Sequence, residues 1–221
     1  MSNNTLNQNA KFVHDLEDSS ESNFIFSNKP INRFKIVNKA TSDNDESKVL
    51  KLLKLKSQIN SIENCNLKLN SKNLILGDGN IDSPIMLIGE APGKIEENLG
   101  LPFQGNVGEL LNKMLSAINI NRDKIYSTYS VNFRPSEDRK PTSQEIKRYS
   151  IFLKEHISII NPKIIILLGG TAMEAVTGLN DKISNERGQW KEIILKNKTL
   201  PIMITFSPSY LIRFHEKKKY S

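Results

Sequence analysis

Residues 85–93 have the sequence Ile-Met-Leu-Ile-Gly-Glu-Ala-Pro-Gly, and this stretch decides the fold. Four consecutive apolar residues predict a short buried strand, and the glycines and proline that follow end the strand in a loop. The segment Lys163–Leu168 contains five consecutive apolar residues, which is typical of a strand covered on both faces. Strands of this kind belong to parallel sheets, in which helices connect one strand to the next.

Helix-like and strand-like segments alternate along the chain around this stretch. Apolar residues spaced three or four apart predict helices at residues 47–62, 107–118, 142–160 and 171–176. Further strands are predicted around residues 125–131 and 201–206. This order predicts an α/β fold, with a parallel sheet of about four strands and helices on both faces. Ligands of such sheets bind beyond the carboxyl ends of the strands.

The composition excludes several classes of protein. The chain has 221 residues and one cysteine, so it lacks internal disulfides and the CxxC pairs of zinc or iron–sulfur sites, and a reducing compartment is expected. The longest apolar run is five residues, far short of the ~18 that a membrane span needs. The first residues lack the basic and apolar regions of a signal peptide. We therefore expect a cytoplasmic protein without membrane association.

Residues 1–45 differ from the rest of the chain in composition. They are rich in Asn, Ser and Asp without a sustained apolar period, which predicts a disordered or loosely packed tail before a domain of residues 46–221. Residues 1–50 hold 6 of the 31 basic and 7 of the 24 acidic residues, so residues 51–221 carry a net charge of +8. A basic domain indicates a polyanion such as nucleic acid, although an abundance of Lys, Asn and Ile throughout the chain also accounts for the charge.

Two of the predicted loops carry candidate functional side chains. Glu90 lies between glycines directly after the first strand, where a carboxylate could activate water, stabilise a cation or simply be solvated. Phe103 lies in the loop Gly100–Gly105, so it is either a stacking platform for a base or an anchor in the core. None of the three histidines occupies such a loop motif, and His156 is expected to be structural.

The run GEAPGKIEENLGLPFQGNVGELLNKML at Gly89–Leu115 resembles the family 4 uracil-DNA glycosylases. The segments RPSEDRKPT, HISIINPKIIILLGG, RGQW and FSPSYLIR follow it in order and at fitting distances. The resemblance runs from about Ser47 to the C-terminus. It implies a three-layer α/β/α glycosylase fold with a four-stranded parallel sheet. It also implies an enzyme of base excision repair that flips uracil or another deaminated base from DNA and hydrolyses its N-glycosidic bond.

The resemblance assigns roles to residues of the first motif. Glu90 matches the carboxylate that orients or activates the attacking water. Phe103 matches the ring that stacks on the extruded base, and Gly89 and Ala91 lie in the backbone that lines the base pocket. These elements of the family pattern are intact.

Two other positions depart from the family pattern. Tyr129 stands where the family has its uracil-reading Asn, and it could fill the pocket or select a different base. Ser207 stands where the family has the His of its HPS or HPA motif, and it could donate a weaker hydrogen bond to the leaving base. Reduced or altered activity is expected. The alternative is a catalytically lapsed DNA-binding homologue that supports repair or replication, a group that includes proteins labelled phage-type DNA polymerase.

The resemblance also bears on cofactors. Some family members hold a 4Fe–4S cluster with four cysteines, whereas this chain has only Cys65, and Phe133 and Tyr149 fall near the positions of two other ligands. Because such a cluster needs four thiolates, we expect no cofactor and no metal site. Apolar packing is expected to fill the space instead.

The DNA-contacting side is implied by the same resemblance. Short hydroxyl groups suit phosphate oxygens and arginines add charge. The residues expected to contact phosphate are Arg134, Arg139, Arg187, Ser209 and Arg213. The expected partner is DNA that contains uracil or other damage, bound by a monomer.

Overall fold

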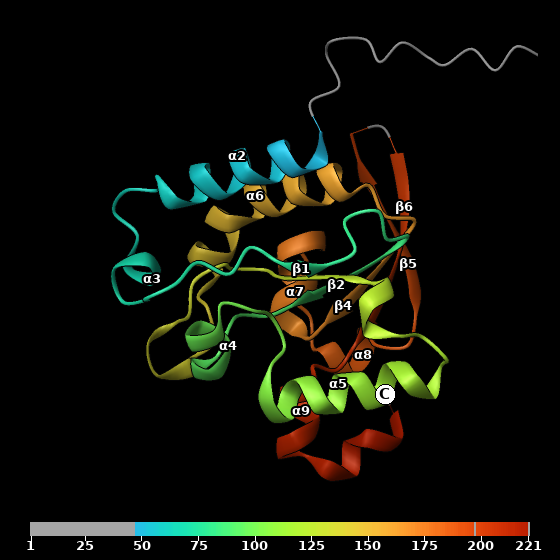
Figure 1. Cartoon of the computed structure of the whole chain (residues 1–221). Coiled ribbons are helices and arrows are strands. Elements are labelled where there is room, and N and C mark those ends of the chain that lie inside the picture. Colours follow the sequence, from blue (N-terminus) through green and yellow to red (C-terminus); the bar gives the residue numbers. More distant parts are fainter. Residues whose placement is uncertain (1–46, 197, 221) are drawn as a thin grey trace, which may run out of the picture. The chain divides into compact units, whose positions relative to one another are not determined.

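The computed structural model describes residues 47–196 and 198–220 (Figure 1). The tail expected at residues 1–45 lies outside the described residues, so the division between it and a domain of residues 46–221 stays a prediction. The helices are α2 (Lys48–Asn60), α3 (Asn66–Leu69), α4 (Lys94–Leu99), α5 (Gly105–Ala117), α6 (Ser143–Ile160), α7 (Gly170–Thr177), α8 (Ile183–Glu186) and α9 (Pro208–Arg213), with 3-10 segments at Arg122–Lys124, Ser136–Asp138 and His215–Tyr220. The strands are β1 (Asp78–Gly79), β2 (Ile85–Gly89), β3 (Tyr126–Tyr129), β4 (Ile164–Leu168), β5 (Trp190–Leu195) and β6 (Lys198–Thr205).

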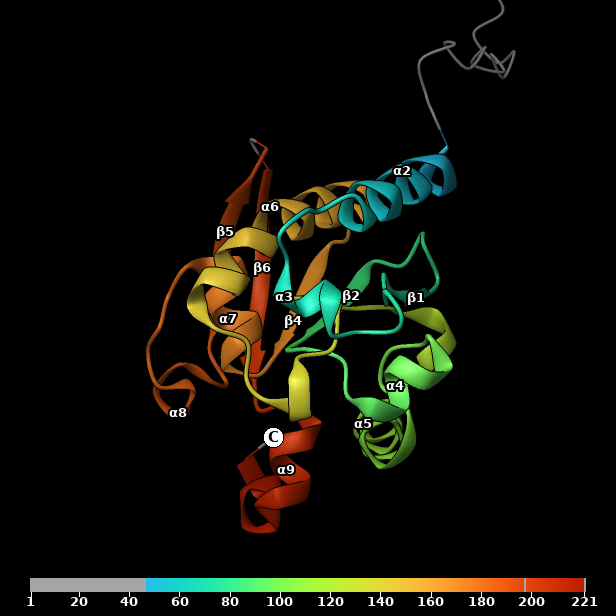
Figure 2. The same ribbon diagram turned by 90° about the vertical axis from the view of Figure 1, so that its left-hand side faces the viewer.

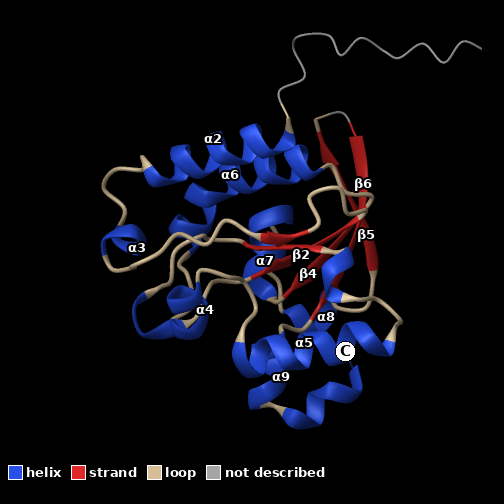
Figure 3. Cartoon of the chain, viewed as in Figure 1, coloured by secondary structure: helices blue, strands red, loops and turns tan. Residues whose placement is uncertain are grey.

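The described strands form one mixed sheet, which Figure 3 draws in red. The order of the strands in it is β1-β3-β2-β4-β6-β5. The inner strands β3, β2, β4 and β6 pair in parallel, which confirms the predicted parallel sheet of four strands. Two antiparallel edge strands extend it, β1 beside β3 and β5 beside β6. β1 consists of two residues and therefore has no apolar period, which is why the sequence did not indicate it.

Helices cover both faces of the sheet, so the fold has three layers (Figure 2). On one face, α6 and α7 pack against β2, β4 and β6, and α2 packs on α6. On the other face, Leu111 and Leu115 of α5 pack against the sheet, and α9 contacts α5. Successive residues of β4 alternate between the two cores, since Ile165 and Leu167 belong to the first and Leu168 to the second. β4 is thus covered on both faces, as its continuous apolar sequence predicted.

The ends of the helices follow local sequence signals. Thr142 Oγ1 accepts a hydrogen bond from Glu145 N at 3.3 Å, and the Glu145 carboxylate accepts one from Thr142 N at 2.8 Å. This is the capping box that the sequence predicts at the start of α6. α7 ends at Gly178, whose φ of +77° is readily adopted only by glycine. The helix predicted at residues 47–62 is present as α2, in which Leu55 and Ile59 are buried and Val49, near its start, is 53% exposed.

His156 of α6 is structural, as predicted. Its side chain is 2% exposed, and its Nε2 lies 2.9 Å from the hydroxyl of Tyr126 in β3. Burial lowers the pKa of His156 to about 3 and raises the pKa of Tyr126, so both groups are neutral at ordinary pH. The pair joins α6 to the sheet inside the core.

Among the described helices, none is both long and apolar enough to cross a membrane.

Candidate active site

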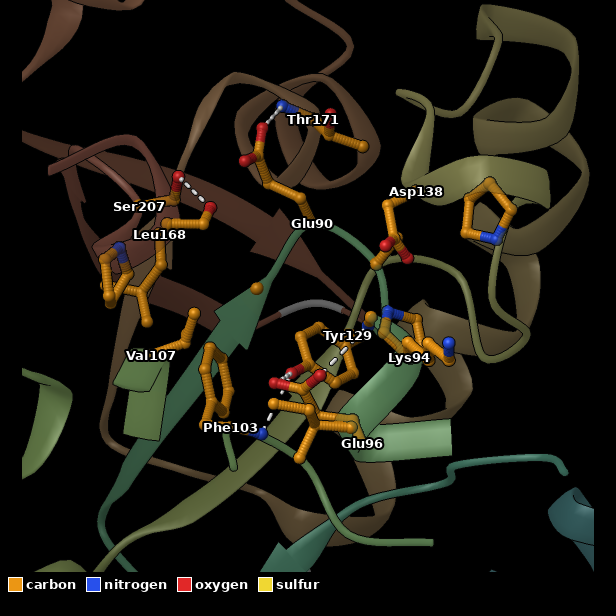
Figure 4. A pocket seen from close by; sticks show the side chains of 18 of the residues that line it. Glu90, Lys94, Glu96, Phe103, Val107, Tyr129, Asp138, Leu168, Thr171 and Ser207 are labelled. Atoms are coloured by element: carbon orange, nitrogen blue, oxygen red, sulfur yellow. Dashed lines mark hydrogen bonds between the residues drawn. The ribbon is translucent and has the colours of Figure 1, made fainter. Parts of the chain in front are cut away.

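A cleft of about 820 Å³ opens at the carboxyl ends of the four parallel strands (Figure 4). Gly89 ends β2, Tyr129 ends β3, Leu168 ends β4, and Ser207 follows β6. The sequence-predicted residues that line the cleft are Gly89, Glu90, Ala91, Phe103, Tyr129, Arg139, Ser207, Ser209 and Arg213. The fold therefore brings most of the predicted site together, at the edge where ligands of parallel sheets bind.

The carboxylate of Glu90 is held at the start of α7. Its Oε1 accepts a hydrogen bond from Thr171 N at 3.2 Å, and the positive end of the helix dipole stabilises its negative charge. Gly169 lies directly against it, because a Cβ added to Gly169 would be 2.4 Å from Glu90 Cδ. Gly169 also has a φ of +109°, a conformation that side chains other than glycine rarely adopt. Backbone geometry thus fixes where this carboxylate meets the cleft.

Phe103 is fixed by its backbone as well as by its ring. Its φ is +54°, and Gly108 approaches it so closely that a Cβ on Gly108 would be 2.1 Å from Phe103 O. The rings of Phe103 and Tyr129 lie 4.8 Å apart, centre to centre, with an angle of 34° between their planes. Gly89 leaves room for both rings, since a Cβ there would be 2.6 Å from Phe103 and 2.8 Å from Tyr129.

The hydroxyl of Tyr129 is bound within the protein. It accepts a hydrogen bond from Phe103 N at 2.9 Å and donates one to Glu96 Oε1 at 3.5 Å. Burial and the nearby Glu96 carboxylate raise the pKa of Tyr129, so the hydroxyl keeps its proton. Glu96 is itself buried and accepts from Gly93 N at 3.1 Å and from Gln104 N at 3.2 Å. It therefore joins the loop that carries Glu90 to the loop that carries Phe103.

Arg122 is a functional neighbour that the sequence reasoning missed. Its guanidinium carbon lies 5.2 Å from the centre of the Phe103 ring, and its Nη2 donates to Pro102 O at 3.2 Å. Its Nη1 is buried without a hydrogen-bond partner among the described residues. Burial lowers the pKa of Arg122, although the guanidinium stays charged. No sequence signal marks this residue, because it lies in a 3-10 segment outside every motif.

Ser207 caps the first turn of α9. Its Oγ accepts from Tyr210 N at 3.3 Å and lies 3.0 Å from Ser209 Oγ. Since the backbone amide uses one of its acceptor sites, the Ser207 hydroxyl can still donate its proton, either to Ser209 or to a group in the cleft. Arg213, in the last turn of α9, is exposed and also lines the cleft.

Three of the predicted phosphate-contacting arginines lie against other groups of the protein. Arg134 donates to Asp138 at 2.7 Å and to the buried carboxylate of Glu97 at 3.3 Å, and it does not line the cleft. Arg139 lines the cleft but forms a bidentate ion pair with Glu145, at 2.7 and 2.9 Å. Arg187 lies outside the cleft lining, with its guanidinium 5.1 Å from the centre of the Phe206 ring.

Lys94 and Lys140 are exposed cations of the cleft that the sequence reasoning did not select. Lys94 begins α4 directly after the loop of Glu90, and Lys140 lies between Arg139 and Pro141. Lys94 is the last residue of the motif string GEAPGK, and Lys140 lies in the string RKP. Their position beside the motifs is therefore a sequence signal that could have indicated them as site residues. Together with Arg213 they place three exposed cations in the lining of the cleft, which also contains the carboxylates of Glu90, Glu96 and Asp138.

The residues at the expected cluster position do not fit an iron–sulfur cluster. Cys65 is buried, and its Sγ lies 3.3 Å from the hydroxyl of Tyr149. The ring of Tyr149 meets that of Phe133 edge to face, with 6.5 Å between their centres. These rings belong to an apolar cluster of α2, α3, α6 and the segment after β3. One thiol among aromatic rings does not supply the four thiolates that the group needs, and no group of three or more candidate metal ligands occurs within residues 47–196 and 198–220.

Comparison with known proteins agrees with the geometry of the cleft. A family model described as the uracil DNA glycosylase superfamily matches residues 76–221, which include every element that lines the cleft. The chain belongs to the uracil-DNA glycosylase superfamily. The expected three-layer fold and the assignment of the motifs to this superfamily are thereby confirmed.

Several relatives within the superfamily carry the name type-4 uracil-DNA glycosylase. A protein of Thermotoga maritima named type-4 uracil-DNA glycosylase is 39% identical over 150 residues, which cover 67% of this chain and 77% of the relative. A protein of Archaeoglobus fulgidus with the same name is 31% identical over 159 residues, covering 70% of this chain and 80% of the relative. A DNA polymerase of Bacillus phage SP01 is 30% identical over 118 residues, but these are only 13% of that polymerase.

Proposed function

We propose that this protein is a DNA glycosylase of base excision repair that hydrolyses the N-glycosidic bond of uracil, or of another deaminated base, in DNA. The observation that carries the proposal is the fixed carboxylate of Glu90, held at the start of α7 in the same cleft as Phe103 and Ser207. The names of the type-4 relatives support uracil as the first base to test.

In the proposed reaction, water attacks C1′ of the deoxyribose while the bond from C1′ to the base nitrogen breaks. The bonding electron pair leaves with the base, and C1′ acquires oxocarbenium character before the water oxygen bonds to it. Glu90 orients the water and accepts its proton, a role for which a carboxylate held near the reacting carbon is suited. The products are the free base and an abasic site in the DNA.

The departing base carries negative charge that a hydrogen-bond donor can stabilise. We assign this role to the hydroxyl of Ser207, which lies in the cleft with its proton available. A serine hydroxyl is a weaker donor than a protonated or neutral imidazole. Loss of one well-placed donor of this kind typically lowers the rate ~100- to 1000-fold, so a slow enzyme is expected.

DNA is proposed to bind across the cleft through Arg213, Lys94 and Lys140, whose side chains are exposed around it. Ser209 can add a hydroxyl contact to a phosphate oxygen. Arg134 and Arg139 are assigned a structural role in this proposal, because each already forms an ion pair with a carboxylate of the protein. Arg187 stays a proposed DNA contact at the side of Phe206.

The proposal also covers the cofactor, the oligomeric state and the compartment of the protein. The protein is expected to act without an iron–sulfur cluster, which the apolar packing around Cys65 supports. It is expected to act as a monomer, and in the cytoplasm, where a reducing environment keeps a lone thiol reduced.

A second candidate function is a catalytically lapsed homologue that binds DNA in support of repair or replication. One observation favours this second candidate. The hydroxyl of Tyr129 is hydrogen-bonded to Phe103 N and Glu96, so it is not presented to a base. The partial match to a phage DNA polymerase is consistent with such a role.

The test uses single- and double-stranded oligonucleotides that contain uracil, hypoxanthine or xanthine, followed by alkaline cleavage at abasic sites. Base release should fall ~100- to 10,000-fold in Glu90→Gln, because the amide keeps the bond from Thr171 N but cannot accept a proton from water. Glu109→Gln is the matched control, since Glu109 is an exposed carboxylate of α5 that does not line the cleft. DNA binding without release of any base would support the lapsed homologue instead.

A further inference from the structure

The hydroxyl of Tyr129 has no hydrogen-bonding role left for a substrate base. As an acceptor it is used by Phe103 N at 2.9 Å, and as a donor it is directed to Glu96 Oε1 at 3.5 Å. Figure 4 shows these groups together below Glu90. Tyr129 therefore does not read a base by hydrogen bonding in this conformation, which leaves its ring as the part that affects the pocket.

That ring lies where a base would have to stack on Phe103. The two ring centres are 4.8 Å apart, and the planes are tilted by 34°, a separation at which aromatic rings are in contact. The guanidinium of Arg122 lies 5.2 Å from the centre of the same Phe103 ring. With both neighbours in place, only 5% of Phe103 is exposed. A base needs most of one face of a ring to stack on it, and this exposure does not provide one.

Phe103 cannot easily turn away to expose a face. Its backbone has a φ of +54°, and its carbonyl is pressed against Gly108. Its N–H is held by Tyr129, and its ring lies so near Gly89 that a Cβ added there would be 2.6 Å from Phe103 Cζ. The Tyr129 hydroxyl is held by that same bond from Phe103 N and by the longer bond to Glu96, so these two bonds must break before the Tyr129 ring can leave Phe103. Opening of the stacking face thus requires movement of the Tyr129 side chain.

We infer that Tyr129 controls the access of a base to this cleft, because its ring covers the stacking face of Phe103 and restricts excision of uracil. The inference rests on the proposed glycosylase function and deepens it. Because the Tyr129 hydroxyl is engaged within the protein and its ring covers Phe103, the closed pocket of the wild-type protein should bind DNA by its backbone, with little discrimination by base.

The inference is tested with Tyr129→Asn, which removes the ring, and Tyr129→Phe as the matched control, which keeps the ring and removes only the hydroxyl. Two readouts are used: single-turnover release of uracil, and binding of a duplex with non-cleavable 2′-fluoro-2′-deoxyuridine compared with a duplex with a tetrahydrofuran abasic site. Tyr129→Asn should release uracil about 10-fold faster or more, the order expected when one stacked base is gained. Tyr129→Phe should gain no more than about threefold in rate over wild type, because its ring still covers Phe103.

The wild-type protein provides a test that does not depend on a variant that may misfold. It should bind the uracil analogue and the abasic duplex within about threefold of each other, whereas Tyr129→Asn should prefer the uracil analogue about 10-fold. A strong preference for the uracil analogue in the wild-type protein would overturn the inference. So would a folded Tyr129→Asn protein, with a cooperative thermal transition, that gains neither rate nor preference.

The two proposals fail in different ways. If Tyr129→Asn gains preference for the uracil analogue but no variant releases any base, the proposed hydrolysis by Glu90 fails and the role of Tyr129 stands. If the wild-type protein releases uracil and Tyr129→Asn is no faster, the glycosylase function stands and the role of Tyr129 fails. If Tyr129→Phe accelerates release as much as Tyr129→Asn, the hydroxyl rather than the ring is responsible, and the inference is overturned.

Discussion

Two adjacent glycines allow a sharp test of how the cleft holds its carboxylate. In Gly169→Ala the new Cβ would lie 2.4 Å from Glu90 Cδ and 2.7 Å from Oε1, so the carboxylate must move away from Thr171 N. The φ of +109° adds backbone strain of about 1–3 kcal/mol, which corresponds to a lower Tm by about 3–9 °C in a domain of this size. Displacement of a reacting group by about 1 Å lowers the rate on the order of 100-fold.

Gly170→Ala is the matched control, because a Cβ at Gly170 meets no atom within 4 Å. Gly170 is also the first residue of α7, where alanine favours the helix over glycine by up to about 1 kcal/mol, so its Tm should be unchanged or slightly higher. The assay is single-turnover base release at saturating protein, alongside thermal unfolding. Equal rates for Gly169→Ala and Gly170→Ala would refute the argument that backbone contact fixes Glu90.

Two further predictions concern the core. His156 has a pKa of about 3 in the folded protein against 6.5 when unfolded, so unfolding takes up a proton between these values, and stability present above pH 6.5 is lost as the pH falls. From pH 7.5 to 5 the free energy of unfolding should decrease by about 2 kcal/mol more in wild type than in His156→Gln, as urea titrations at the two pH values would measure; equal decreases would contradict it. At the Cys65 cluster, Tyr149→Phe should destabilise by only about 1 kcal/mol, because it loses one weak hydrogen bond to sulfur, whereas Tyr149→Ala should destabilise by about 3–5 kcal/mol. Iron and sulfide in near-stoichiometric amounts in anaerobically purified protein would disprove the packing argument on which this prediction rests.

Local patterns of the sequence were sufficient for the order of the main elements. The five apolar residues of β4 and the capping box at Thr142 act over neighbouring residues, so the sequence alone indicates them. The same holds for the loop that carries Glu90, since it directly follows β2 and the carboxyl ends of parallel strands meet at one edge whatever the details of packing. The short edge strand β1 escaped prediction because two residues carry no period.

Only the tertiary structure decided what the side chains in these loops are able to do. Tyr129 was left open as a residue that fills the pocket or selects a base, and its hydroxyl proved to be bound to groups 26 and 33 residues away in the chain. The sequence predicts that Arg134 contacts DNA, and the structure adds that its guanidinium is bound to Glu97, 37 residues earlier.

Local sequence patterns thus indicated the order of the main elements, the edge of the sheet where the cleft opens and the carboxylate placed there. Periodicity and turn chemistry are set by residues close together in the chain, and they need no knowledge of distant partners. The tertiary structure alone decided that Tyr129 covers Phe103 and that Arg134 and Arg139 are neutralised by carboxylates. Hydrogen bonds and ring contacts of these groups depend on which distant segments the fold brings within a few ångströms, and no local pattern encodes that choice.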